Sequence, residues 1–173
     1  MEIRELEATD RDAVERFVAR VPEGDRTFFK EDVDTPAVLE AWTRPGTARA
    51  VAVDAGEVVG YLAVVPLHGW SSHVGEVRVI VDPDRRGTGI GRALTRRAVI
   101  EAAELDLRKL VVEVVAEQEA TITMFRSLGF DPEALLTNHV RDQSGALRDL
   151  MILAHSVDEE WSSLIVAGIA YEL

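Results

Sequence analysis

The sequence contains no cysteine. Disulfide bridges, cysteine-ligated zinc sites and cysteine nucleophiles are therefore excluded. Long hydrophobic runs are missing too. The first residues lack the apolar core of a signal peptide, and the longest apolar run near the end, residues 164–171, is far shorter than the roughly 20 residues of a membrane-spanning helix. We therefore expect a cytoplasmic protein that does not enter a membrane.

Positive charge is scarce. The formal net charge is −12, whereas sequence-independent binding to nucleic acids or anionic membranes needs a basic surface. We therefore expect neither kind of partner. An acidic surface is compatible with a cationic substrate, but it also serves solubility alone, and the sequence leaves both interpretations open.

Metal-ligand spacing is absent as well. The four histidines do not form an H-E-x-x-H or similar pattern, so we expect no metal site. His73 lies just before a predicted strand. It is the histidine that we consider for substrate contact or proton transfer.

The 173 residues, 47% of them hydrophobic and 29% charged, fit one globular domain. Alternating strand and helix patterns predict a mixed α/β fold with a partly parallel sheet. Predicted strands cover residues 3–6, 48–53, 58–65, 74–81, 110–115, 135–141 and 147–155. Predicted helices cover residues 9–21, 35–42, 89–105, 119–128 and a terminal segment from about 159. Thr9 is the expected N-cap of the first helix, residues 24–34 are expected to form a loop, and residues 110–115 are expected to be buried on both faces.

A glycine-rich turn stands where a predicted strand gives way to a helix. Gly87, Gly89 and Gly91 let the backbone turn tightly and approach a ligand. The first N–H groups of a helix have no partner within it, and the helix dipole favours an anion, so the turn predicts a phosphate site.

Five arginines surround this turn in a stretch without acids: Arg85, Arg86, Arg92, Arg96 and Arg97. We expect Arg86 and Arg92 to contact the ligand, because guanidinium groups suit a diphosphate. Arg96 and Arg97 are expected to belong to a solvated helix face.

The spacing of the glycines distinguishes this turn from two known phosphate-binding motifs. A dinucleotide fingerprint needs G-x-G-x-x-G, but Arg92 stands where the third glycine would be, and no P-loop run occurs. The pattern present is R-x-x-G-x-G, preceded by V-x-P at Val81-Asp82-Pro83. With a strand before it and an amphipathic helix after it, this segment resembles motif A of the GNAT acetyltransferases. Residues 124–130, M-F-R-S-L-G-F, resemble the family's later helix, which typically ends in L-Y-x-x-x-G-F.

The resemblance extends from residue 3 to about residue 155. It implies a GNAT acetyltransferase domain over residues 1–155, with a mixed, partly parallel sheet of about six to seven strands flanked by helices. Residues 156–173 lie outside it. We expect them to form an extra helix that packs on the same domain or at a homodimer interface.

The resemblance also implies acetyl-CoA as co-substrate and an amine-bearing acceptor. By analogy, the pantetheine arm runs along the strand before the turn, and the N–H of Val79 polarises the acetyl carbonyl. The implied cofactor-binding residues are Val79, Val81, Arg86, Gly87, Thr88, Gly89, Ile90, Gly91, Arg92 and Gln118.

Glu76 is the candidate base, because the family often uses a strand carboxylate for this step. Period two places Glu76 and Arg78 on one strand face, so Glu76 has a second interpretation as a simple ion-pair partner. A bulge in this strand, usual in the family, would change that phase.

Two residues depart from the family pattern. Phe125 stands where the family has the tyrosine that protonates the leaving sulfur, and Gln118 stands where it often has asparagine. A phenyl ring cannot donate a proton, so we expect Phe125 only to pack. Water or another residue such as Tyr61 would take that role.

The expected function is transfer of acetyl from acetyl-CoA to a primary amine of a small molecule or protein terminus by direct attack. The alternative is a non-catalytic acyl-CoA-binding module of the same fold. We expect the acceptor to be selected near Phe28, Phe29, Trp42 and Trp70.

Overall fold

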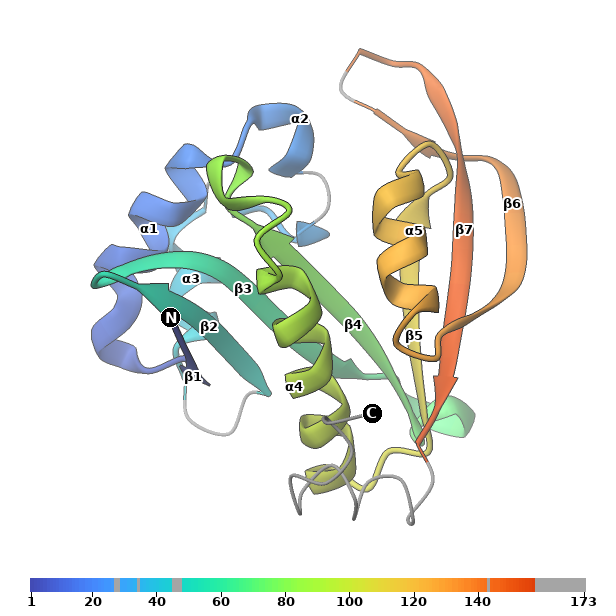
Figure 1. The fold of residues 1–173 in the computed structure, drawn as a ribbon, viewed down its shortest axis with the longest axis horizontal. Helices are drawn as coiled ribbons and strands as arrows, with labels where there is room; N and C mark the ends of the chain where they lie inside the picture. Colours follow the sequence, from blue (N-terminus) through green and yellow to red (C-terminus); the bar gives the residue numbers. More distant parts are fainter. Residues whose placement is uncertain (27–28, 34, 45–47, 143, 158–173) are drawn as a thin grey trace.

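A seven-stranded sheet organises the chain in the computed structural model (Figure 1), which describes residues 1–26, 29–33, 35–44, 48–142 and 144–157. The strand order is β1-β2-β3-β4-β5-β7-β6, and only β4 and β5 are parallel neighbours. The strands are β1 (Glu2–Glu5), β2 (Arg49–Asp54), β3 (Glu57–Pro66), β4 (Val74–Val81), β5 (Lys109–Val115), β6 (Asp131–Arg141) and β7 (Leu147–Ser156). The predicted mixed, partly parallel sheet is confirmed. The predicted terminal helix lies outside the described residues.

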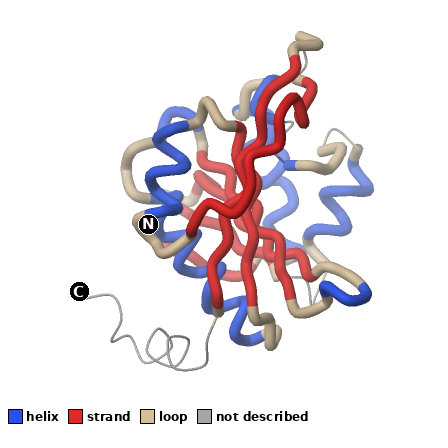
Figure 2. Tube along the Cα trace, turned by 90° about the vertical axis from the view of Figure 1, so that its right-hand side faces the viewer, coloured by secondary structure: helices blue, strands red, loops and turns tan. Residues whose placement is uncertain are grey.

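Helices lie on both faces of the twisted sheet (Figure 2). They are α1 (Arg11–Arg20), α2 (Glu23–Arg26), α3 (Pro36–Trp42), α4 (Ile90–Glu104) and α5 (Glu119–Arg126). Side chains alternate along β3: Leu62 and Val64 join a core under α4 and α5, whereas Tyr61 and Ala63 join a core under α1 and α3. No helix in the described segments combines the length and hydrophobicity that crossing a membrane requires.

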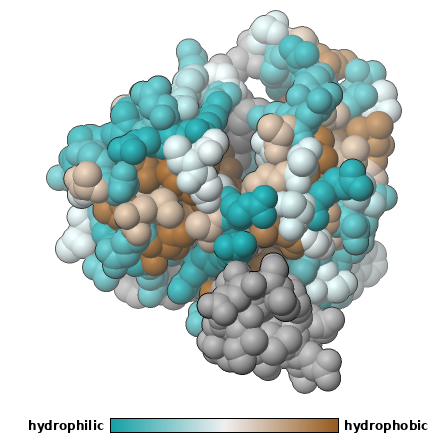
Figure 3. Space-filling view, in the orientation of Figure 1, coloured by the Kyte–Doolittle hydropathy of each residue, from teal (hydrophilic) through white to brown (hydrophobic). Residues whose placement is uncertain are grey.

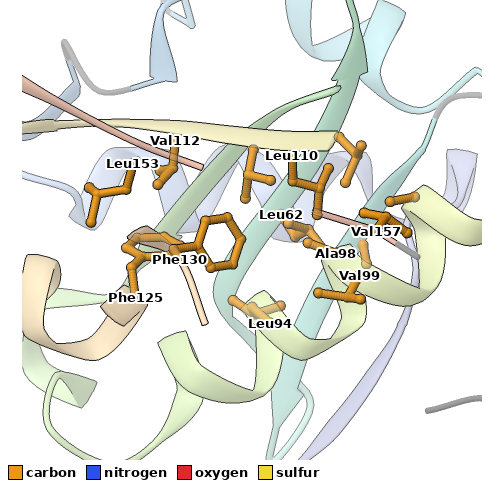
Figure 4. Close-up of a cluster of buried hydrophobic side chains, with 14 of the residues drawn as sticks. Leu62, Leu94, Ala98, Val99, Leu110, Val112, Phe125, Phe130, Leu153 and Val157 are labelled. Atoms are coloured by element: carbon orange, nitrogen blue, oxygen red, sulfur yellow. The ribbon is translucent and has the colours of Figure 1, made fainter. Parts of the chain in front are cut away.

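Helix α4 packs on the sheet as its four-residue repeat predicts. Leu94, Ala98 and Ala102 are each 0% exposed, and Figure 4 shows Leu94 directed toward Leu62 of β3. Gly60 of β3 permits this close approach, because a Cβ there would lie 2.9 Å from side-chain atoms of Ile90 and Leu94. The first turn of α4 is therefore held against the sheet.

The start of the first helix differs from the prediction. Thr9 is not its N-cap, because a short 3-10 turn, Ala8–Asp10, precedes α1. The Asp10 carboxylate accepts hydrogen bonds from Arg4 (2.7 and 2.6 Å) and from the N–H of Glu7 (2.9 Å). These bonds tie β1 to the beginning of α1 and fix the turn.

Two further local predictions are wrong. The described part of residues 24–34 is more than a loop: it includes most of α2, and Phe29 is 0% exposed. Strand β5 is not buried on both faces, because only alternate residues are buried and those between them, such as Glu113, are half-buried. Both segments, residues 24–34 and β5, carry polar residues that belong to the site described next.

Candidate active site

Strands β4 and β5 pair over only three residues and then separate. Their parallel pairing ends at Glu76 and Val111, while β4 remains paired with β3 up to Val81 and β5 with β7 up to Val115. Figure 1 shows the two strands diverging from this point. We call the separated segments, Val77–Val81 and Val112–Val115, the fork. Among the described residues, the edge of β4 that faces β5 has no strand partner in the fork, so its backbone polar groups are available to a ligand.

The glycine-rich turn lies at the open end of the fork, where α4 begins (Figure 1). Gly87 (φ 74°) and Gly89 (φ 89°) adopt left-handed conformations that favour glycine, and Gly89 is the N-cap of α4. Among the described residues, the backbone N–H groups from Gly87 to Arg92 have no hydrogen-bond acceptor. Together with the helix dipole they form a surface suited to an anion.

The arginines around the turn are partly neutralised by acids from other elements. Arg86 pairs with Asp25 of α2 at 2.6 Å, and Arg85 pairs with Asp54 of β2 at 3.1 Å. Arg92 is half-buried and has no ion pair in the described part of the chain. The sequence stretch without acids is therefore not a free basic surface, because the fold brings carboxylates to it.

The surface of this face is mixed in hydropathy. In Figure 3, hydrophilic side chains cover the region over α1 and the turn before α4, and hydrophobic side chains show beside them. Since Arg86 pairs with Asp25 there, an incoming anion must compete with that carboxylate.

Gln118 is the N-cap of α5, which also begins at the open end of the fork. Its N–H donates to the carbonyl of Val115 at 2.9 Å, which fixes the connection from β5 to α5. Gln118 and the glycine-rich turn therefore flank the same opening.

Phe125 packs, as the sequence predicts. It is 2% exposed, and its ring lies 5.2 Å from that of Phe130 in an edge-to-face arrangement (Figure 4). Tyr61 is not a substitute proton donor on this side of the sheet: it is 1% exposed in the opposite core, where it stacks on Trp42. Burial raises the pKa of the Tyr61 hydroxyl well above its usual range.

Glu76 stands where the fork begins, on the face of β4 opposite to Val77. Its pairing phase is regular, without a bulge between β3 and β4, so Glu76 and Arg78 share a face and form an ion pair at 2.8 Å. A second cation, Lys30, approaches Glu76 Oε1 to 2.9 Å. Desolvation raises the pKa of the Glu76 carboxyl, but the hydrogen bonds from Arg78 and Lys30 outweigh it, and the pKa lies below its ordinary value.

The ion-pair network continues on both sides of Glu76. Lys30 also contacts Glu113 of β5, so its ammonium bridges the two strands where they separate. Arg78 approaches Glu31 at 3.6 Å, and Arg49 approaches the same carboxylate at 3.3 Å. Glu76 is therefore ionised and held in place by cations at neutral pH, so it is free to accept a proton but is a weaker base than an unpaired carboxylate.

Lys30, Glu31 and Glu113 are not among the site residues predicted from the sequence. Glu113 carried a usable signal, because it is a lone charge within the hydrophobic run Leu110–Val115. Lys30 and Glu31 carried no such signal, since only the tertiary fold brings their segment across the sheet. His73 is exposed at the loop before β4, and among the described residues its side chain does not join this network.

The aromatic residues expected near the acceptor divide into two groups. Phe29 and Trp42 are 0% and 1% exposed in the core under α1 and α3, so they support the site rather than line it. Trp70 is 97% exposed on the loop between β3 and β4. Phe28 lies outside the described residues.

A family model now adds to this geometry. The model of the acetyltransferase (GNAT) family matches residues 10–130, which is more than half of the chain and includes β4, the glycine-rich turn, α4 and α5. The chain belongs to the GNAT acetyltransferase family. The resemblance found in the sequence is thereby confirmed.

Relatives of this GNAT protein are named as acetyltransferases or acyltransferases. It is 27% identical to the uncharacterized N-acetyltransferase YjgM of Escherichia coli (strain K12) over 157 residues, 86% of this chain and 94% of that protein. It is 30% identical to the L-amino acid N-acyltransferase MnaT of the same strain over 125 residues, 71% of this chain and 72% of that protein. It spans 27% and 29% of the length of two mycothiol acetyltransferases that it also matches.

One solved structure with the same fold contains a bound ligand. The structure of yncA from Salmonella typhimurium, with its cofactor acetyl-CoA, has a TM-score of 0.74 and 27% identity, and the match covers 92% of this chain and 95% of that one. GNAT proteins use acetyl-CoA. The residues here fit that ligand, because the turn offers N–H groups to a pyrophosphate and the fork offers backbone groups to amides.

Proposed function

We propose that this GNAT protein transfers an acetyl group from acetyl-CoA to a primary amine by direct attack of the amine. The observation that carries the proposal is the continuity of the fork. Its unpaired β4 edge leads from the free N–H groups of the glycine-rich turn to the carboxylate of Glu76. An anion-binding surface, an amide-binding edge and a proton acceptor thus follow one another along the chain.

The β4 segment of the fork supports a linear ligand. In the proposed binding mode the pantetheine amides meet the backbone of Val79 and Val81, as an added strand would. The pyrophosphate meets the N–H groups of the glycine-rich turn, with Arg92 beside it. Gln118 contacts the ligand from the start of α5. Most of these contacts use backbone atoms, so they depend on the turn's conformation more than on its side chains.

The amine must lose a proton before or during attack, because an alkyl ammonium has a pKa near ~10.4 in water. Glu76 is the proposed proton acceptor. Arg78 and Lys30 hold its pKa below the ordinary value, which weakens it as a base. Displacement of Lys30 by an incoming ammonium exchanges one cation for another and leaves Glu76 next to the group that it deprotonates. The CoA thiolate is an acceptable leaving group, since a free thiol has a pKa near ~8.5.

The acceptor class follows from charge and from one relative. Glu76 and Glu113 present two carboxylates at the fork, which favours an ammonium group. MnaT is named as acting on L-amino acids, so L-amino acids come first in an acceptor panel, followed by simple alkyl amines and peptides with free termini.

Glu76→Gln tests the proposal. Calorimetric titration should show that wild type and variant bind acetyl-CoA equally, whereas general-base loss should lower kcat about 10²–10⁴-fold. Glu133→Gln is the matched control, because Glu133 also pairs with a lysine, Lys109 at 2.7 Å, outside the fork. Absence of acetyl-CoA binding at millimolar concentration would overturn the proposal.

The alternative is a non-catalytic acyl-CoA-binding module, and the buried phenyl ring of Phe125 favours it. Binding of acetyl-CoA without turnover across the whole amine panel would select this alternative. A cytoplasmic location and a homodimer through residues 156–173 remain predictions.

A further inference from the structure

Lysine is rare in this chain. The sequence has two lysines, Lys30 and Lys109, and 17 arginines. Both lysines form ion pairs with glutamates, and their side chains are 29% and 33% exposed. They differ in place: Lys30 lies where the fork begins, and Lys109 lies at the start of β5. Lysine and arginine are not equivalent there, because a lysine amine can be deprotonated and acylated whereas a guanidinium stays protonated.

The backbone around Lys30 directs its side chain to this place. Phe29 before it is 0% exposed in the core, and Glu31 after it accepts a hydrogen bond from the Trp42 indole. Lys30 itself has φ 60°, a left-handed conformation that is costly for a residue with a side chain. The surrounding contacts therefore over-determine the position of Lys30.

The ammonium of Lys30 occupies the place that any acceptor amine must reach. Its Nζ lies 2.9 Å from Glu76 Oε1 and also contacts Glu113. A base acts on a proton within hydrogen-bond distance, so the amine of an acceptor has to come equally close to Glu76. The chain thus presents one of its own amines to its own proposed base, at high effective concentration.

We propose that Lys30 is a self-acetylation site. The inference rests on the proposed function, since acetyl-CoA supplies the acyl group. Glu76 takes a proton from the Lys30 ammonium, and Nζ attacks the thioester carbonyl carbon. A C–N bond forms, and the C–S bond breaks with its electron pair on sulfur. The attached nitrogen then loses its second proton, which the CoA thiolate receives, and Glu76 releases the first proton to solvent. The products are an acetamide on Lys30 and free CoA, without oxidation or reduction.

Acetylation of Lys30 changes the site that performs it. The neutral amide no longer forms ion pairs with Glu76 and Glu113, which leaves Arg78 as the cation on Glu76. Loss of the Lys30 hydrogen bond removes one of the causes that lower the pKa of Glu76, so that carboxyl becomes a stronger proton acceptor. The modification is therefore expected to alter activity toward external amines as well as the mass of the chain.

The test compares the two lysines within one protein. The full chain is incubated with acetyl-CoA after any acetylation present on isolation has been measured, and peptide mass spectrometry follows each lysine over time. Lys30 should gain one acetyl group at least about tenfold faster than Lys109, and Glu76→Gln should slow Lys30 about 10²–10⁴-fold without changing the rate at Lys109. Lys30→Arg keeps the positive charge and should remove the modification.

Parallel assays of acetyl-CoA binding and of the amine panel separate the two hypotheses. Equal rates at Lys30 and Lys109, or a Lys30 rate that Glu76→Gln leaves unchanged, would refute self-acetylation while external transfer still supports the proposed function. Acetyl-CoA binding with no transfer to Lys30 or to any panel amine would overturn both.

Discussion

The glycine-rich turn allows a sharp test of the proposed cofactor site through Gly89→Ala. Gly89 has φ 89°, and a Cβ added to it would meet no atom within 4 Å. The expected cost to folding is therefore backbone strain alone, about 1–2 kcal/mol for an L-residue in the left-handed region. For a chain of this size that corresponds to a fall in Tm of roughly 2–8 °C.

The same substitution should weaken acetyl-CoA binding, because in the proposed binding mode the pyrophosphate approaches this turn closely, and a methyl group and a strained backbone at Gly89 would disturb that approach. We expect at least about a tenfold rise in Kd, which is about 1.4 kcal/mol. Isothermal titration calorimetry measures this, and thermal unfolding measures the strain in the same samples. A control variant with equal backbone strain outside the proposed ligand site distinguishes loss of a ligand contact from a general loss of stability.

Gly145→Ala supplies that control. Gly145 has φ 86°, lies in the β6–β7 turn, and also has no atom within 4 Å of an added Cβ. Its fall in Tm should match that of Gly89→Ala, whereas its affinity for acetyl-CoA should equal that of wild type. Equal affinity in all three proteins would refute the assignment of the pyrophosphate to this turn.

Two other predictions follow from the ion pairs. Asp25→Asn should tighten acetyl-CoA binding several-fold at low salt, because it releases Arg86, whose side chain is 54% exposed. The gain in affinity should shrink at high salt, since salt screens the attraction between Arg86 and the ligand. Titrations at two salt concentrations that show weaker binding by the variant would contradict this. The hydrogen bond from Arg4 lowers the pKa of the Asp10 carboxyl below its ordinary value of 3.8. The resulting stabilisation is present above that value and is lost as the pH falls through the folded-state pKa. The difference in unfolding free energy between wild type and Asp10→Asn, measured with urea, should therefore be constant from about pH 6 to 8 and shrink below about pH 4; a difference unchanged at pH 3 would contradict the assignment.

Local features of the sequence predicted the turn and α4 well. The four-residue repeat that includes Leu94 and Ala98 faces the core, and glycines at 87 and 89 take the conformations that only glycine adopts cheaply. These features are determined by residues close together in the sequence, so the sequence alone could predict them. Local hydrophobic patterns also predicted a strand at each strand of the described residues, although β6 begins at Asp131 and not at the predicted residue 135.

The fork and its charge network depended on tertiary structure. β4 leaves β5 after Glu76 while it stays paired with β3, and nothing in the local pattern of β4 marks Glu76 as the last residue paired with β5. Lys30 reaches that point only because Phe29 enters the core under α1 and α3. Residues 24–34 lack regular periodicity, so their sequence could not reveal this path.

Strand β4 explains why loss of the family tyrosine does not remove the base. Along β4, Val77 faces the core under α4 and α5, whereas Glu76 and Arg78 lie on the opposite face. Phe125 belongs to the first of these cores. Phe125 and Glu76 thus lie on opposite faces of the sheet. In the proposed mechanism, the replacement of tyrosine by Phe125 affects only the departure of the thiolate, and the ion pairs that hold Glu76 do not involve Phe125.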